Sequence, residues 1–449
     1  MSPTNETEVL TEINKLNSRK AAADDDIGNK TVQICPKIFA NKLTTIYNHY
    51  IERGEYPEAL KLAKCIPIYK KEEHYLPNNY RPISLLSVFD KIFEKLVSYR
   101  LLNFLMKYDI LYKHQFGFRK LHSCTLALIE LTDQIRKLID EEKIVFSLFV
   151  DFAKAFDTVD HNILMYKLNH YGIRGQAYNF FKSYLSNRVQ YTYVNGSKSS
   201  IKAITHGVPQ GSVLGPILFL IFINDLYRCV SESLTRLFAD DTSLNMARKD
   251  PHELYQLAVS NIKKFISWCN HNKLTINYDK THFLLFHAKN KKIPIFFDQI
   301  EINGKVIKRK AHTKYLGIKI DDKFLWHDQV DYVHKSLLKY YSIFNRIKYL
   351  VNKNVIRQIF FAFVFSKIKY GLEVYGSCSK DYIKKLQVIQ NGLLKILTQK
   401  QKRTSTDALH KELRLLKVND AYRQQLICFV NNCFAKKHQL CSIIILTIR

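Results

Sequence analysis

Three aspartates stand beside apolar segments, where an uncompensated negative charge is costly. Asp240 and Asp241 follow the apolar residues 237–239, and Asp151 ends the near-continuous apolar run within KIVFSLFVDF (143–152). Burying one unpaired carboxylate costs several kcal/mol, and adjacent carboxylates also repel each other. Hard divalent ions such as Mg²⁺ would supply the missing positive charge, because they bind carboxylate oxygens. Two such ions about 4 Å apart can hold the attacking and leaving oxygens of an in-line phosphoryl displacement.

The alternative for the ADD sequence is a polar turn, in which aspartates accept backbone N–H bonds. The metal hypothesis requires the chain to bring Asp151 next to the other two aspartates. The run 143–150 has the continuous apolar character of a buried strand, and residues 237–244 have the pattern of strand, turn and strand. If these strands pair, the three carboxylates meet at one edge of a sheet.

Turn and helix signals outline the surrounding elements. Hairpins are expected at Asn195–Gly196 and Asn303–Gly304, because Asn-Gly suits a two-residue turn. A helix is expected to start at Pro216, since proline favours the first helical position. After about residue 321 the strand signals stop, and apolar residues recur at helical spacing with lysines between them. This part of the chain is therefore predicted to be a basic helical region.

The bulk composition indicates a partner with negative charge. The net charge is +29, which favours nucleic acid over a membrane surface. The longest apolar stretch, 213–223, is too short to cross a bilayer, and the polar N-terminus does not resemble a signal peptide. The nine cysteines show no repeated metal-binding spacing, including the group near the end formed by Cys428, Cys433, His438 and Cys441. We expect an intracellular protein with reduced structural cysteines.

Seven segments occur in a fixed order along the chain. The first two are NYRPISLLSVFDKIFEKL (79–96) and QFGFRKLHSCTLAL (115–128); the next three are FVDFAKAFDTVDH (149–161), GVPQGSVLGPILFLIFINDL (207–226) and LFADDTSL (237–244); the last two are WCNHNKLTINYDKTHFLLF (268–286) and TKYLGIKID (313–321). Together they resemble the motifs of one enzyme family, the reverse transcriptases of non-LTR, LINE-type retrotransposons, with the jockey-like branch most similar. The first two segments resemble finger motifs, the next three resemble consecutive palm motifs, and the last two resemble the motifs that follow the palm.

The resemblance implies an α+β fold shaped as a right-hand polymerase. Fingers, a palm of antiparallel sheet plus helices, and a helical thumb are the expected parts. Residues 1–50 would form an N-terminal helical extension, and 51–320 the reverse transcriptase domain with fingers and palm. Residues 321–449 would form the basic helical thumb and C-terminal region, whose abrupt end is read as a truncation.

The same resemblance assigns the catalytic groups. Asp151, Asp240 and Asp241 would be the metal-binding carboxylates, with the backbone carbonyl of Phe152 as a further ligand. Lys280 matches the lysine proposed in the family to protonate the pyrophosphate leaving group. Two Mg²⁺ ions are implied as cofactors, with Mn²⁺ as an alternative. By contrast, Asp157 and Asp160 lie near an expected helix start and are interpreted as caps rather than ligands.

Further matches concern the incoming nucleotide. Lys70 and Arg81 resemble the finger residues that hold the triphosphate, with Lys71 as a substitute for Lys70. Phe156 occupies the family's steric-gate position, where its ring would exclude a 2′-hydroxyl; the alternative is an ordinary core phenylalanine. Gln210 and Gly211 would contact the nucleotide. Three of only 14 glycines fall within nine residues of that loop, which indicates close backbone approach or positive φ at Gly207, Gly211 and Gly215.

The function implied is RNA-directed DNA polymerisation, which extends a DNA 3′-hydroxyl on an RNA template with dNTPs. Two alternatives stay open at this point: a catalytically inactive RNA-binding remnant, and a group II intron maturase-like protein. Relatives usually carry an endonuclease that nicks the target, so integration would need one supplied elsewhere. No membrane partner is expected, and action in the nucleus follows from where such elements integrate.

Overall fold

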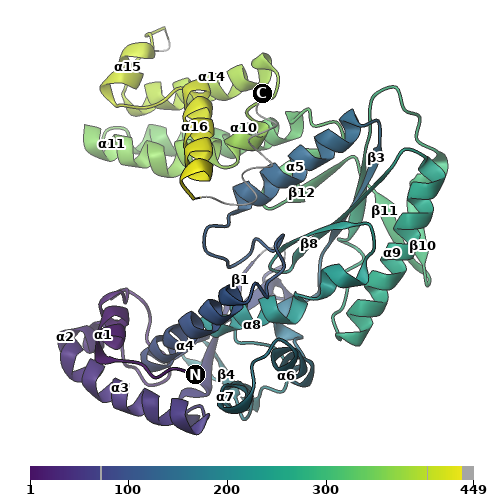
Figure 1. Cartoon of the computed structure of the whole chain (residues 1–449). Helices are drawn as coiled ribbons and strands as arrows, with labels where there is room; N and C mark the ends of the chain where they lie inside the picture. The colour runs from purple at the N-terminus through teal and green to yellow at the C-terminus, as the bar shows by residue number, and fades with distance from the viewer. Residues whose placement is uncertain (71–72, 402, 437–449) are drawn as a thin grey trace. The chain divides into compact units, whose positions relative to one another are not determined.

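A computed structural model describes residues 1–70, 73–401 and 403–436, and it divides the chain into two compact units (Figure 1). Unit 1 comprises Met1–Lys120, Asp151–Thr242 and Ser260–Asn277; unit 2 comprises Leu121–Val150, Ser243–Val259 and Tyr278–Arg449. Each unit combines helices with sheet, so the expected α+β class is confirmed. No helix within the described residues has both the length and the apolar character needed to cross a membrane.

Unit 1 contains a sheet in the order β2-β1-β4-β5, with β6 also paired to β4. β1 runs antiparallel to β2, with Ile68 opposite Arg81, and parallel to β4. The strands and helices of this unit are α1 (Glu6–Asn14), α2 (Asn29–Ile34), α3 (Pro36–Arg53), β1 (Leu62–Tyr69), β2 (Tyr80–Leu85), α4 (Val88–Lys107), α6 (His161–His170), α7 (Gly175–Leu185), β4 (Val189–Val194), β5 (Ser197–Lys198), β6 (Lys202–Ala203), α8 (Leu214–Ile223) and β7 (Leu234–Phe238).

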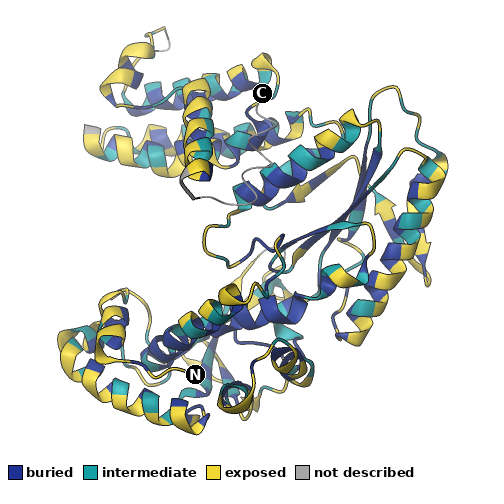
Figure 2. Ribbon diagram, in the orientation of Figure 1, coloured by how far each residue is buried: buried dark blue, intermediate teal, exposed yellow. Residues whose placement is uncertain are grey.

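Helix α8 forms the centre of unit 1. Its sequence LGPILFLIFI is apolar on every side, and Figure 2 shows it buried around its circumference. A helix of that kind is stable only when other elements surround it. Helices α4 and α6 pack against it. The start of α8 therefore lies deep in the unit rather than at its surface.

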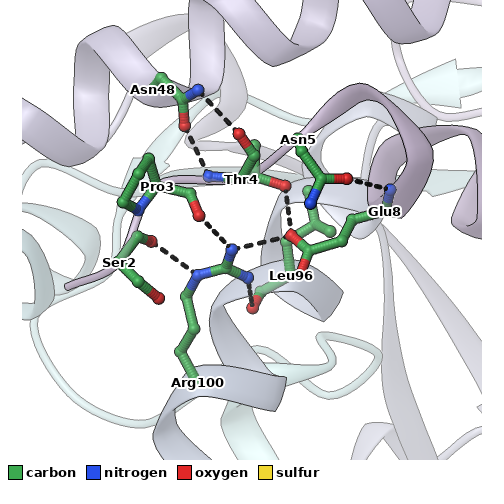
Figure 3. Close-up of polar contacts among 8 residues, drawn as sticks. All are labelled: Ser2, Pro3, Thr4, Asn5, Glu8, Asn48, Leu96 and Arg100. Carbon is green, nitrogen blue, oxygen red and sulfur yellow. Dashed lines mark hydrogen bonds and ion pairs between the residues drawn. The ribbon is translucent and has the colours of Figure 1, made fainter.

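The N-terminal segment is fastened to α4 by a single arginine (Figure 3). Arg100 donates hydrogen bonds to the carbonyls of Ser2, Pro3 and Leu96 at 2.6–2.9 Å and to the Glu8 carboxylate at 2.8 Å. Asn48 of α3 exchanges two further bonds with the backbone of Thr4. Because the guanidinium offers five donors in a rigid fork, one side chain can hold this length of backbone.

Unit 2 is built on a sheet in the order β10-β11-β9-β3-β8. β3 is antiparallel to β9 and buried at every residue (Figure 2). The strands are β3 (Ile144–Val150), β8 (Asp241–Arg248, whose first two residues belong to unit 1), β9 (His282–Phe286), β10 (Gln299–Ile302), β11 (Lys305–Arg309), β12 (His312–Tyr315) and β13 (Ile318–Asp321).

Helices complete unit 2, and their apolar faces share one core with β3 and β9. The helices are α5 (Cys124–Asp140), α10 (His327–Ile347), α11 (Lys353–Phe360), α12 (Ser366–Lys369), α13 (Leu372–Tyr375), α14 (Lys380–Leu397), α15 (Asp407–Glu412) and α16 (Val418–Lys436), with a π-helical turn at Phe361–Phe365. The long helix α9 (Pro251–His271) contributes residues to both units.

Several expectations from the sequence are confirmed. The run 144–150 is a buried strand, and both Asn-Gly pairs form hairpin turns with positive φ at each residue. The last described strand ends at Asp321, after which the described chain is helical. Each described cysteine is free; Cys428 and Cys433 lie in α16, and His438 and Cys441 lie outside the described residues.

The expected start of a helix at Pro216 is wrong by two residues. Helix α8 begins at Leu214, because side chains satisfy backbone N–H groups that would otherwise be unpaired at its start. The Ser212 hydroxyl accepts from Gly215 N at 2.7 Å, and the Glu94 carboxylate accepts from Val213 N. These partners allow the helix to begin before the proline.

Candidate active site

The three aspartates of the metal hypothesis interact through their charges. Burial raises the pKa of Asp240, its own backbone N–H lowers it, and the charge on Asp151 raises it further. Burial of the carboxyl group raises the pKa of Asp241 to about 6, with the charges on Asp240 and Asp151 adding to the effect. The charge effects, which are smaller than that of burial, indicate that the three carboxylates lie near one another in a partly desolvated place. The chain therefore brings Asp151, Asp240 and Asp241 into electrostatic contact.

The side chains of Asp151, Asp240 and Asp241 do not form a complete set of ligands for a metal ion. Across residues 1–70, 73–401 and 403–436, no three His, Cys, Asp or Glu side chains are arranged closely enough to hold a metal ion. The chemistry of the donors nevertheless fits a hard divalent cation, because carboxylate oxygens are its usual ligands. The mutual repulsion of the carboxylates is the charge deficit that a bound cation would offset.

The backbone beside Asp151 is held by the segment that follows α9. Asn277 N donates to Asp151 O at 2.8 Å, and Ala153 N donates to Thr275 O at 2.8 Å. These two bonds flank Phe152, which forms an isolated bridge with Ile276. Neither of them uses the carbonyl of Phe152, so this oxygen stays compatible with the ligand role that the sequence predicts.

The turn that carries the pair of aspartates is strained and tightly bounded. β7 ends at Phe238 and β8 begins at Asp241, and between them Ala239 adopts a left-handed φ of +56°. A left-handed conformation costs an ordinary residue about 1 kcal/mol or more, so neighbouring contacts must hold it.

Those contacts come from residues that sequence reasoning did not single out. Gln115 is buried, and its Oε1 accepts from Gly117 N at 2.8 Å and from Ala239 N at 3.1 Å. Phe116 N donates to Leu237 O at 2.7 Å, and Leu237 N donates to His114 O at 3.0 Å. The segment 114–117 thus runs beside β7, and its hydrogen bonds hold the turn before Asp240 in position.

Gly117 is required by this close approach. A Cβ added there would lie 2.3 Å from Ala239 N and 3.0 Å from the carbonyl carbon of Phe238. The sequence offers one sign of this contact, because a glycine stands in QFGF in a chain with only 14 glycines. The residues around Gly117 do not indicate that it contacts residue 239.

Two of the predicted triphosphate-binding residues, Arg81 and Lys70, act on Asp240. The positive charges of Arg81 and Lys70 lower the pKa of Asp240, against the stronger effects of burial and of Asp151. Arg81 is exposed on β2, and Lys70 follows β1, where its N–H donates to Asn79 O at 2.9 Å. Lys71, the substitute for Lys70, lies outside the described residues. The arrangement offers positive charge next to the carboxylates, as a nucleoside triphosphate would need.

Phe156 packs between two other rings. Its ring stacks on Phe219 at a centroid distance of 4.4 Å and meets Phe118 edge-on at 6.3 Å. Phe156 itself is only half-buried. The ring is therefore held in one orientation while part of its surface stays open, which suits the expected steric gate.

The glycine-rich loop is held against the chain itself. The Gln210 carbonyl accepts from Ser84 N at 2.7 Å, and its amide donates to Asp157 Oδ1 at 2.8 Å. At Gly211 (φ +131°) an added Cβ would lie 2.4 Å from Ser84 O, and at Gly207 (φ +82°) it would lie 2.7 Å from Asp157 O. Close backbone approach and positive φ are confirmed for both glycines. Protein backbone, rather than a nucleotide, already accounts for them.

The cap interpretation is right for one aspartate and wrong for the other. Asp160 caps α6, where its carboxylate accepts from Ile163 N at 3.0 Å and pairs with Lys273 at 2.7 Å. Asp157 instead lies in the short turn before α6 and accepts the bond from Gln210. The long-range partner decides its role, which no local pattern predicts.

Comparison with known proteins decides the family. The family model described as reverse transcriptase (RNA-dependent DNA polymerase) matches residues 68–320, more than half of the chain. The chain belongs to the reverse transcriptase family.

Similar proteins of this family come from retrotransposons of Drosophila melanogaster. The chain is 28% identical over 434 residues to a probable RNA-directed DNA polymerase from transposon BS (94% of this chain, 47% of that protein). It is 29% identical over 431 residues to the RNA-directed DNA polymerase from mobile element jockey (92% and 46%) and 28% identical over 433 residues to a probable one from transposon X-element (94% and 47%). The chain thus spans about half the length of these relatives.

Among solved structures, the chain aligns with an apo telomerase from Candida tropicalis truncated from its C-terminal domain. The TM-score is 0.37, with 13% identity over 61% of this chain and 59% of that chain.

One residue assigned through the reverse transcriptase resemblance belongs to the other unit. Lys280 lies in unit 2, in an exposed turn just before β9, and its carbonyl contacts His282 Nδ1 at 2.6 Å. The other predicted site residues all belong to unit 1: Asp151, Phe152, Asp240, Asp241, Lys70, Arg81, Phe156, Gln210 and Gly211. Reverse transcriptases generally use divalent metal ions, which agrees with the oxygen donors found here.

Proposed function

We propose that this chain is the RNA-directed DNA polymerase of a non-LTR retrotransposon, acting with an RNA template, a DNA primer and dNTPs. The observation that supports it best is electrostatic. Asp151, Asp240 and Asp241 interact through their charges, Arg81 and Lys70 act on Asp240, and all five groups belong to one unit. A site of this composition can bind divalent ions on one side and a triphosphate on the other.

Each side chain has a role in the proposed reaction. Asp151, Asp240 and Asp241, with the carbonyl of Phe152, would hold two Mg²⁺ ions, or Mn²⁺ in their place. When bound, such ions activate the attacking 3′-hydroxyl and neutralise charge on the leaving pyrophosphate. Arg81 and Lys70 would hold the triphosphate, and Gln210 and Gly211 would contact the nucleotide.

The direct test is primer extension on poly(rA)–oligo(dT) with dTTP. We expect incorporation with Mg²⁺, loss of incorporation with excess EDTA, and recovery when Mg²⁺ is restored. Template binding without incorporation under every ion condition would contradict the proposal and support the RNA-binding remnant. Integration would further require an endonuclease, which we propose is supplied by another protein or another part of the element.

Sugar selection tests the role of Phe156. We expect Phe156→Ala to accept ribonucleotides, because removing the ring opens space for a 2′-hydroxyl. The preference for dTTP over UTP, measured as the ratio of kcat/KM values, should fall at least about tenfold, the scale of one steric contact. Phe434→Ala serves as a control, because it removes an exposed phenylalanine ring in α16 of unit 2 and leaves Phe156 and its neighbours in place. An unchanged ratio in Phe156→Ala would contradict the assignment.

Salt dependence tests the nucleic-acid partner. The net charge is +29, and exposed lysines such as Lys335, Lys339 and Lys384 line the helices α10 and α14. If these lysines contact phosphates, affinity for an RNA–DNA duplex should fall about 1,000-fold or more between 50 and 200 mM salt, as for six or more contacts. Replacing the three lysines by glutamine should flatten the slope of log Kd against log salt. An unchanged slope would exclude these helices as a phosphate-binding surface.

A further inference from the structure

Two carboxylates are fully buried side by side in α4, outside the aspartate site. Asp90 and Glu94 lie one turn apart, and both are 0% exposed. Buried carboxylates are costly unless hydrogen bonds and opposite charge surround them. Arg188, at 1% exposure, lies 3.9 Å from Asp90 through Nη2 and Oδ2.

The two acids have different partners. Asp90 accepts a hydrogen bond from the Tyr56 hydroxyl. Glu94 accepts from the Tyr184 hydroxyl at 2.6 Å through Oε1, and from the backbone N–H of Val213 through Oε2. Only Glu94 therefore contacts the segment that leads into α8.

Different groups act on the pKa of each acid. Burial, and then the negative charge of Glu94, raise the pKa of Asp90 to about 8. Burial raises the pKa of Glu94 as well, but its hydrogen bonds from Tyr184 and Val213 and the charge on Arg188 favour the ionised form. The Glu94 carboxyl group lies directly at the N-terminus of α8, where it accepts from Val213 N and where the helix dipole favours an anion.

Val213 is the downstream end of the loop that carries Gln210 and Gly211. The upstream end is fixed by bonds from Gly207 N to Val159 O and from Val208 N to Phe156 O, at 2.8 and 2.9 Å. The middle is fixed by Ser84, which donates to Gln210 O. The buried Glu94 carboxylate fixes the end, so the loop is held at three places.

We infer that Glu94 is a positioning residue for nucleotide binding: its buried carboxylate holds Val213 and the start of α8, and so sets the position of the loop 207–213. This inference rests on the proposed function, because the loop is the place where Gln210 and Gly211 would meet the incoming nucleotide. Glu94 acts through this loop and makes no contact with the nucleotide itself.

The test is Glu94→Gln in primer extension at varied dTTP. The amide keeps the size of the side chain but loses the charge and offers one oxygen for two donors. We expect KM for dTTP to rise about tenfold, the lower end of the effect of outer-shell partners, with kcat changed less than threefold. A purely structural role would reduce the amount of folded protein and leave KM unchanged.

The matched control is Asp90→Asn, on the same helix and equally buried, whose partner is Tyr56 instead of the loop. Its KM for dTTP should equal that of the wild type. A second variant, Tyr184→Phe, keeps the Glu94 charge but removes one hydrogen bond, and should raise KM by a smaller factor of about three. It decides the question if Glu94→Gln does not fold.

The outcomes separate the two claims. Wild-type incorporation with unchanged KM in Glu94→Gln, or equal KM shifts in Glu94→Gln and Asp90→Asn, would overturn this inference alone. No incorporation by the wild type would overturn the proposed function and this inference with it.

Discussion

Asp240→Asn removes metal-dependent nucleotide incorporation while leaving the protein folded. Asparagine replaces a charged ligand by a neutral amide within the carboxylate group, where Asp151 raises the pKa of Asp240 and Asp240 raises the pKa of Asp241. Loss of outer-shell partners of metal ligands typically costs 10–100-fold, so loss of a ligand itself should exceed about 100-fold. The measurement is dTTP incorporation on poly(rA)–oligo(dT), with Mg²⁺ and then with Mn²⁺.

The same substitution should make the metal-free protein more stable. The pKa of Asp241 is raised to about 6, so its ionised form is disfavoured in the folded state. The resulting loss of stability is present above about pH 6 and disappears toward the ordinary carboxyl pKa near 4. In EDTA, Asp240→Asn should therefore unfold at a higher temperature than the wild type at pH 8, and the gain should shrink at pH 5.

The control for both measurements, incorporation and Tm, is Asp140→Asn. It makes the same change of charge at an exposed position at the end of α5. It should alter neither incorporation nor the pH dependence of Tm. Full activity of Asp240→Asn would end the case for a carboxylate metal site. A lower Tm at pH 8 would show that the carboxylates do not repel each other.

Gly117→Ala should disable the site although residue 117 contacts no substrate. The added Cβ would lie 2.3 Å from Ala239 N and 3.0 Å from the carbonyl carbon of Phe238. Both are backbone atoms, which cannot rotate away as a side chain could. Either the segment 114–117 or the turn at Ala239 must move, which breaks the two hydrogen bonds of Gln115. Overpacking of this kind costs about 1–3 kcal/mol. A displacement of 1 Å at reacting groups can cost about 100-fold in rate.

We expect incorporation by Gly117→Ala to fall about 100-fold and Tm to fall by several degrees. Gly28→Ala is the matched control in the same unit. Gly28 has φ −78°, and a Cβ there meets no atom within 4 Å. It should match the wild type in both measurements. Wild-type activity in Gly117→Ala would show that the contacts of segment 114–117 with the turn are not needed to position Asp240.

These two predictions concern one physical problem, the assembly of like charges at a strained turn. Repulsion among Asp151, Asp240 and Asp241 works against the folded arrangement, and the left-handed Ala239 adds strain. The segment around Gln115 supplies hydrogen bonds that hold the turn in place. The loss of folding stability caused by repulsion among the carboxylates is thus offset by buried contacts in the same unit.

The sequence by itself determined the elements whose signals are local. The continuous apolar run before Asp151 predicts a buried strand, because both faces of β3 are covered. Asn195–Gly196 predicts a hairpin, because both residues tolerate positive φ. Asp160 predicts a helix cap for the same kind of reason: its carboxylate needs only the N–H three residues ahead. The seven motifs likewise placed the chain in the family that the comparison shows.

Only the tertiary structure decided which distant residues meet. Gln115 bonds Ala239 across 124 positions, and Glu94 bonds Val213 across 119. Asp157, expected as a cap, bonds Gln210 instead, 53 positions away. Such partners are chosen by how buried elements pack, and the residues beside each group in the chain carry no record of that choice. The carboxylates were therefore visible in the sequence, whereas the contacts that hold them in position were not.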